Sequence, residues 1–93
     1  MHVRVRLPTQ LRNLAAGASS VVVDSMPATV SSVLDSLAAT HPALERRVRN
    51  ETGRARVHVN LFVDDDNIRD LDGVDTAIAD GSDLSIIPAI SGG

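Results

Sequence analysis

The chain has 93 residues, a formal net charge of −3 and no cysteine. Its length fits one small domain, and the lack of cysteine excludes disulfides, thiolate zinc sites and a thiol nucleophile. The negative charge and a single aromatic residue, Phe62, argue against nucleic acid as a partner. The absence of a signal sequence or a long apolar run predicts a cytoplasmic protein with no membrane contact.

The first 24 residues predict two strands joined by a polar connection. Residues 2–7 alternate between polar and apolar side chains as far as Pro8, which is the period of a half-buried strand. Residues 9–18 are typical of a polar connection, and residues 19–24 contain a run of three valines that favours a second strand. We expect the two strands to pair as a hairpin.

Two helices are expected next. Thr29 suits the N-cap of the first helix, because its hydroxyl can accept a hydrogen bond from a free backbone N–H. Apolar residues then follow at the spacing of one helical face, at Val30, Val33, Leu34, Leu37 and Ala38. This helix should end near Thr40-His41, ahead of Pro42. Pro42 is itself a suitable first residue for a short second helix over residues 43–49.

The second half of the chain predicts more strands. After a polar loop over residues 50–56, residues 57–63 alternate as a third strand with four apolar residues on one side, Val57, Val59, Leu61 and Val63. An acidic turn at residues 64–67 leads to a short return strand beginning at Ile68-Arg69, and residues 84–89 predict the last strand. This order predicts an α+β fold, a mixed sheet with one face packed on one main helix and the other face open.

The polar clusters do not have the spacing of a catalytic or metal site. His2, His41 and His58 fall in different elements, and the acidic turn lacks the glycine and glutamate that an EF-hand loop requires. We therefore expect no metal, and no phosphate loop or nucleophile elbow occurs. A basic stretch over residues 46–56 is typical of a solvated face or, alternatively, of a surface that steers an acidic partner.

The sequence ends in Gly92-Gly93, directly after the apolar segment LSIIPAIS. Residues without Cβ atoms make a thin backbone that can enter a narrow channel and leave the last carboxylate sterically open. A frayed end is the alternative, since chain termini tolerate many sequences. Six extended residues would span about 20 Å. The carboxylate of Gly93 is therefore the one candidate for chemistry.

These features resemble the ThiS/MoaD family of sulfur carriers, which have the ubiquitin-like β-grasp fold. The resemblance covers the whole chain and is carried by VNLFV at 59–63, TAIADGSD at 76–83 and LSIIPAISGG at 84–93. It is strongest for the carriers of cysteine biosynthesis, on the block from Asn60 to Arg69 and on Ile87-Pro88-Ala89. Molybdopterin carriers tend to have bulky aromatics where this chain has Ile86-Ile87, which argues against that role. The resemblance implies one domain over residues 1–93 with a tail formed by Pro88, Ala89, Ile90, Ser91, Gly92 and Gly93.

The resemblance implies a protein cosubstrate, not an enzyme, with no cofactor bound. An E1-like adenylating enzyme would use ATP to activate Gly93, and a sulfur donor would displace AMP to leave a thiocarboxylate. The acceptor would be a PLP-dependent cysteine synthase, followed by a zinc metallopeptidase that frees cysteine. Thiamin, molybdopterin and secondary metabolites are alternative destinations for the sulfur. A ubiquitin-like modifier of lysines and an interaction module with an inert tail are the alternative classes.

The strand pattern also suggests a docking surface. Phe62 and Ile87 have the wrong parity to join the core positions of their strands, so we expect both on the open face of the sheet, where exposed apolar clusters are typical of partner sites. A register slip or bulge that buries them is the alternative. The resemblance adds Arg12, because related carriers have an arginine near the first loop.

Overall fold

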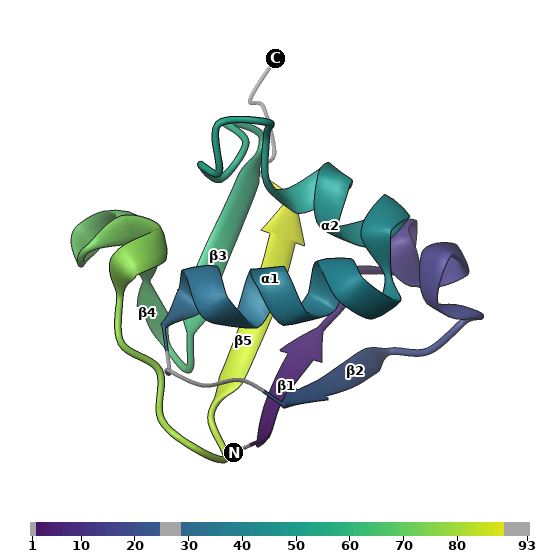
Figure 1. Cartoon of the computed structure of the whole chain (residues 1–93), viewed down its shortest axis with the longest axis horizontal. Helices are drawn as coiled ribbons and strands as arrows, with labels where there is room; N and C mark the ends of the chain where they lie inside the picture. The colour runs from purple at the N-terminus through teal and green to yellow at the C-terminus, as the bar shows by residue number, and fades with distance from the viewer. Residues whose placement is uncertain (1, 25–28, 89–93) are drawn as a thin grey trace.

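Within the described residues, 2–24 and 29–88, the protein forms a five-stranded mixed sheet in the order β2–β1–β5–β3–β4 (Figure 1). The structure is a computed structural model. Its strands are β1 (His2–Arg6), β2 (Ser20–Asp24), β3 (Val59–Val63), β4 (Asp66–Asn67) and β5 (Asp83–Pro88). β1 and β5 run parallel, and the other neighbours are antiparallel. The predicted α+β fold and the β1–β2 hairpin are confirmed.

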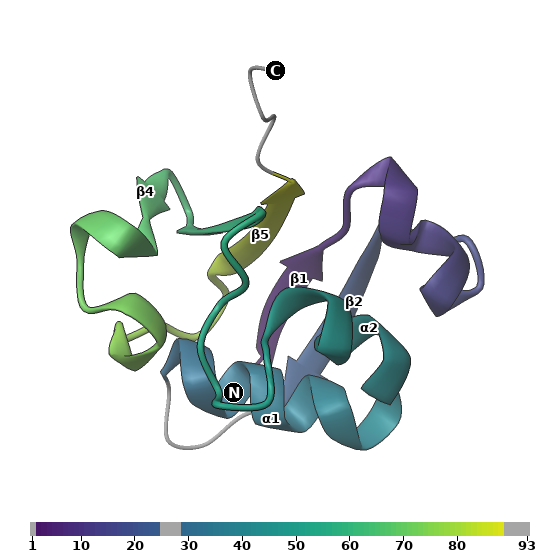
Figure 2. The same ribbon diagram turned by 90° about the horizontal axis from the view of Figure 1, so that it is seen from above.

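The α-helices lie on one side of this sheet (Figure 2). They are α1 (Val30–Thr40) and α2 (Pro42–Val48), with three 3-10 helices, η1 (Thr9–Ala15), η2 (Ile68–Asp70) and η3 (Gly73–Asp75). The predicted N-cap of α1 is confirmed, because Thr29 Oγ1 accepts from the Ser32 N–H at 3.1 Å and Ser32 Oγ accepts from the Thr29 N–H at 2.9 Å. This reciprocal capping box satisfies two backbone donors at the start of α1.

The core lies between α1 and the inward side of the sheet. The α1 stripe contributes four buried residues, and alternate residues of the three central strands complete the layer. These residues are Val30, Val33, Leu34 and Leu37 from α1 and Val3, Val5, Val59, Leu61, Leu84 and Ile86 from the sheet. Ala38 and Val63, both predicted to face inward, are only partly buried. The other side of the sheet carries exposed residues, as the one-sided helix stripe predicted.

Three local predictions are wrong. The expected polar connection at 9–18 contains η1, whose apolar residues pack against the core. The third strand begins at Val59, and Val57, expected to face inward, is 74% exposed. Ile68-Arg69 belong to η2, and the return strand is β4, inside the expected acidic turn. Ile68 is only 2% exposed. The 3-10 helix η2 turns its side chain into the core, whereas an extended strand would continue along the edge of the sheet.

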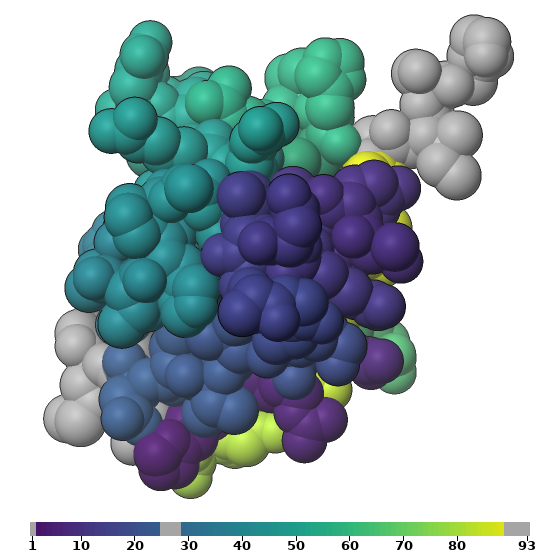
Figure 3. All heavy atoms as spheres, turned by 90° about the vertical axis from the view of Figure 1, so that its right-hand side faces the viewer, coloured from purple at the N-terminus to yellow at the C-terminus, as the bar shows by residue number. Residues whose placement is uncertain are grey.

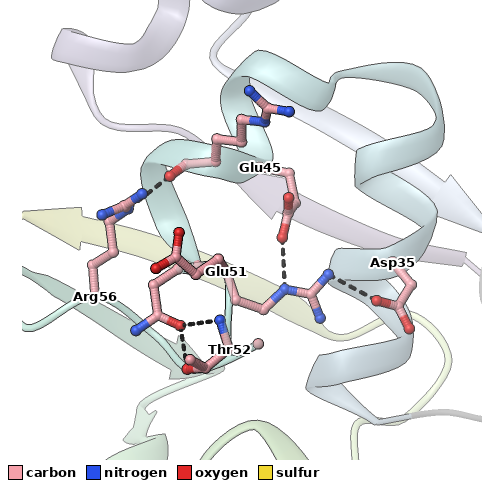
Figure 4. A pocket seen from close by; sticks show the side chains of 9 residues that line it. Asp35, Glu45, Glu51, Thr52 and Arg56 are labelled. Atoms are coloured by element: carbon pink, nitrogen blue, oxygen red, sulfur yellow. Dashed lines mark hydrogen bonds and ion pairs between the residues drawn. The ribbon is translucent and has the colours of Figure 1, made fainter.

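An ion triad fixes α2 against α1 (Figure 4). Arg49, which directly follows α2, donates from Nε to Glu45 Oε1 at 2.6 Å and from Nη2 to Asp35 Oδ1 at 2.7 Å. The side chains of Arg49 and Glu45 are only 11% and 12% exposed. Burial on its own lowers the pKa of Arg49, but the hydrogen bonds to Asp35 and Glu45 outweigh it and raise the pKa. The buried carboxylate and guanidinium therefore satisfy each other.

The turn before β5 is attached to the start of β1. Asp80 Oδ1 accepts from the His2 N–H at 2.7 Å, and the Gly81 N–H donates to the His2 carbonyl at 2.8 Å. The hydrogen bond from His2 lowers the pKa of Asp80, because it stabilises the charged carboxylate.

We expect Asp80→Asn to lower the free energy of unfolding at neutral pH. Because the folded-state pKa of Asp80 is depressed, its contribution is present above the ordinary carboxyl pKa and is lost as pH falls through the folded-state pKa. Urea unfolding at a series of pH values should therefore show a difference between Asp80→Asn and wild type that shrinks toward acid. The control is Asp65→Asn, in an exposed turn. A difference that is the same at all pH values would contradict this account.

Candidate functional site

The end of β5 is the part of the structure from which the predicted reactive tail departs. Pairing with β1 covers Asp83, Leu84 and Ser85, whereas pairing with β3 continues to Pro88, which lies opposite Val59. The last residues of β5 are thus held on one side only. On the other side they border a shallow pocket of about 150 Å³ lined by Pro8, Gln10, Leu11, Arg47, Val59, Ile86 and Pro88. Backbone in such a half-paired strand can accept a partner strand.

The open face of the sheet carries the two predicted docking residues. Ile87 lies opposite Asn60 and is 45% exposed, and Phe62 lies between Ser85 and Asn67 and is half-buried. The alternation along β3 and β5 is regular, so the structure shows the expected parity and no register slip. The exposed Val22 of β2, opposite Arg4, lies on the same face.

Arg12 lies in η1, not on the strands that carry Phe62 and Ile87. Its Nε donates to the carbonyl of Leu7 at 3.3 Å, and its own carbonyl accepts from the Gly17 N–H at 2.8 Å. The half-buried side chain therefore ties η1 to the end of β1. The structure does not join Arg12 to the apolar residues of the open face.

The remaining site predictions fall on residues 89–93, including Gly93, which lie outside the described residues. In the described ranges, no group of three His, Asp or Glu side chains is arranged to hold a metal ion. None of the described helices has the length and apolarity needed to cross a bilayer.

Sequence reasoning did not foresee a basic pocket beside the end of β5. This pocket, of about 690 Å³, is lined by Arg46, Arg47, Asn50, Arg56, Val57, His58 and Val59. We call its three arginines, Arg46, Arg47 and Arg56, the arginine surface. Arg56 Nε donates to the Arg46 carbonyl at 2.7 Å, which fixes the loop to the last turn of α2. The basic stretch was visible in the sequence, but its position beside β5 was not.

Arg69 holds the same loop from the other side. Its Nη2 lies 3.3, 3.3 and 3.1 Å from the carbonyls of Arg56, Val57 and Val59. One guanidinium thus fixes the segment that leads into β3, and with it the neighbour of the last residues of β5.

A mixed sheet whose first and last strands are parallel neighbours at its centre, with a helix across one face, is the ubiquitin-like β-grasp arrangement. The comparisons with known proteins agree. The chain belongs to the ThiS family, whose model matches residues 5–93.

Relatives in this family cover the chain from end to end. The sulfur carrier protein CysO of Mycobacterium tuberculosis is 35% identical over 95 residues, 100% of both chains. Its crystal structure has a TM-score of 0.83 at 33% identity, covering 95% of this chain and 99% of that chain. A chain of the Amycolatopsis orientalis BexX/CysO complex gives 0.84 at 32% identity over 98% and 99%. Small archaeal modifier protein 1 of Haloferax volcanii is 37% identical over 84% of this chain and 86% of its own length.

The two faces of β5 can be distinguished by stability. Ile86→Ala should lower the free energy of unfolding by about 2–5 kcal/mol, because Ile86 is buried against the core. Ile87→Ala, one residue further on, should cost about 1 kcal/mol or less, since its side chain faces solvent. Urea denaturation of the two variants measures both values. Equal losses would contradict the assignment of Ile87 to the open face.

Proposed function

We propose that the protein carries sulfur as a thiocarboxylate on Gly93 and delivers it in cysteine biosynthesis. The observation that supports this most is the match to the sulfur carrier CysO over the full length of both chains. A second observation is that the central strand, β5, is the last described element before the glycine pair in the sequence. The protein acts as a cosubstrate, and the catalytic groups belong to its partners.

The proposed chemistry begins with two steps at the carboxylate of Gly93. The Gly93 carboxylate attacks the α-phosphate of ATP on an E1-like enzyme, which forms the acyl-adenylate and releases pyrophosphate. A sulfur donor then attacks the acyl carbon and expels AMP, which leaves the thiocarboxylate. Its sulfur attacks an activated acceptor held by a PLP-dependent synthase. The resulting cysteine thioester of Gly93 rearranges by an S-to-N acyl shift to an amide, and a metallopeptidase then hydrolyses this amide to release cysteine. ATP, PLP and the metal are bound by these partners.

The structure supports this role by giving the tail a rigid base. β5 is anchored by β1 in its first half and by β3 from Leu84 to Pro88. Five residues, 89–93, follow Pro88, and fully extended they would reach about 17 Å. We propose that this reach brings Gly93 into the active site of a partner docked on the body of the domain.

We propose the open face around Phe62 and Ile87 as the main docking surface. Ile87 is an exposed apolar residue in the strand that precedes the tail, and Phe62 lies on the neighbouring strand. A partner that covers this face also contacts the strand that precedes the tail in the sequence. Arg12, which holds η1 against β1, would act at the edge of such an interface. We further propose that the protein works in the cytoplasm.

A second candidate is a ubiquitin-like modifier joined through Gly93 to lysines of other proteins. It is favoured by the similarity to small archaeal modifier protein 1, whose crystal structure has a TM-score of 0.80 at 33% identity over 100% of both chains.

The test is the intact mass of the protein after incubation with ATP, sulfide and extract of the host cell. Exchange of one oxygen for sulfur, located at Gly93 and dependent on ATP, is the expected result. The variant lacking Gly92 and Gly93 should show no exchange while its circular dichroism spectrum and urea midpoint remain those of the wild type.

Two other results would argue against the proposal. Adducts of the chain on lysines of extract proteins, without the sulfur exchange, would assign the modifier function. An unchanged mass, with an active control carrier in the same extract, would leave an interaction module with an inert tail.

A further inference from the structure

The charges of the protein are unevenly distributed along β5. At its start, Asp83 forms ion pairs with Arg4 and Arg6 of β1 at 3.7 and 3.9 Å, so the cations there are neutralised by a carboxylate. At its end, Pro88 lies opposite Val59, immediately after the segment that carries Arg56. The chain as a whole is negative, but the end from which the tail departs is bordered by the arginine surface.

The cations of the arginine surface are available to a partner. Arg46, Arg47 and Arg56 are exposed, and no described carboxylate forms an ion pair with any of them. The nearby acids Asp35 and Glu45 are bound by Arg49. Glu51 lines the adjoining pocket and is the nearby carboxylate that this triad does not use. The local charge is therefore positive.

The arginine surface is continuous with the end of β5. Arg47 and Val59 line both the basic pocket and the small pocket that contains Ile86 and Pro88. α2, which carries Arg46 and Arg47, contacts η1, and the two lie side by side in Figure 3. Val57, 74% exposed, adds an apolar contact in the same pocket. A partner that binds the end of β5 would lie next to these residues.

We infer that the arginine surface docks against an acidic protein surface beside the channel that receives the tail, and orients the chain during association. A negative chain approaching an acidic partner is repelled unless its positive end leads, so this arrangement favours encounters with the tail first. Nucleic acid is the less suitable partner, because the net charge is −3 and the chain has one aromatic residue for stacking. The inference rests on the proposed function for the identity of the partner.

The surface can be tested without that partner by using poly-L-glutamate as a probe. Amide NMR shifts of the labelled full chain at low salt should change at Arg46, Arg47, Val57 and His58. These shift changes should be lost in the double variant Arg46→Gln/Arg47→Gln. They should be retained in the control double variant Arg4→Gln/Arg6→Gln, which removes the same charge from the open face. Added salt should suppress them, because the Debye length shrinks from about 10 Å at 0.1 M to about 3 Å at 1 M.

Three results would overturn the inference. They are the absence of shifts, shifts that survive in Arg46→Gln/Arg47→Gln, and stronger shifts at the same amides with a duplex DNA oligonucleotide at equal charge concentration. The last result would assign a nucleic-acid surface instead.

The functional readout is the rate of thiocarboxylate formation against carrier concentration. At low salt Arg46→Gln/Arg47→Gln should need roughly tenfold more carrier for half-maximal rate, with an unchanged maximal rate. Arg54→Gln, which removes an exposed arginine outside both the arginine surface and the open face, should show a smaller shift. Equal shifts in both variants, or none, would reject the inference while leaving the proposed function intact. No thiocarboxylate from wild type would reject the proposed function, and the poly-L-glutamate titration would still decide the surface.

Discussion

The pairing of β5 with both β1 and β3 is the constraint on which the rest of the structure depends. It places the last strand of the chain at the centre of the sheet, where it is hydrogen-bonded to the first strand. The parallel contact with β1 needs a crossover, and α1 occupies it on one face, where its apolar stripe covers β1 and β5. The same pairing leaves the second half of β5 supported by β3 alone, next to the residues that follow Pro88.

Polar contacts position the elements around that strand. The triad of Arg49, Glu45 and Asp35 joins α2 to α1, and Arg56 attaches the following loop to α2 through a backbone carbonyl. Among the described residues, no buried side-chain nitrogen or oxygen lacks a hydrogen-bond partner. The backbone that carries the arginine surface is thus attached by directional hydrogen bonds, which places these arginines beside the end of β5.

The sequence predicted most of the fold because the decisive signals were local. Thr29, the α1 stripe and the alternation around Phe62 and Ile87 each depend on near neighbours in the chain, and the structure has them as expected. The local predictions that were wrong depend on contacts with residues far away in the sequence. Val57 alternates correctly, but β3 begins only where Pro88 provides a partner, at Val59. η1 and the burial of Ile68 depend on packing against the core. The arginine surface required the register that brings residue 56 beside the end of β5.

The chemical nature of the arginine surface has one further consequence. All nine residues counted as Lys or Arg are arginines, and the sequence contains no lysine and no cysteine. A guanidinium stays protonated at neutral pH, because its pKa is far above that range, and it is a poor acyl acceptor. A lysine amine or a thiol, by contrast, can capture an activated carboxyl group. Positive charge can therefore lie next to the reactive end without competing for it. Two copies of this chain meeting at high concentration would offer each other no side-chain amine or thiol to acylate.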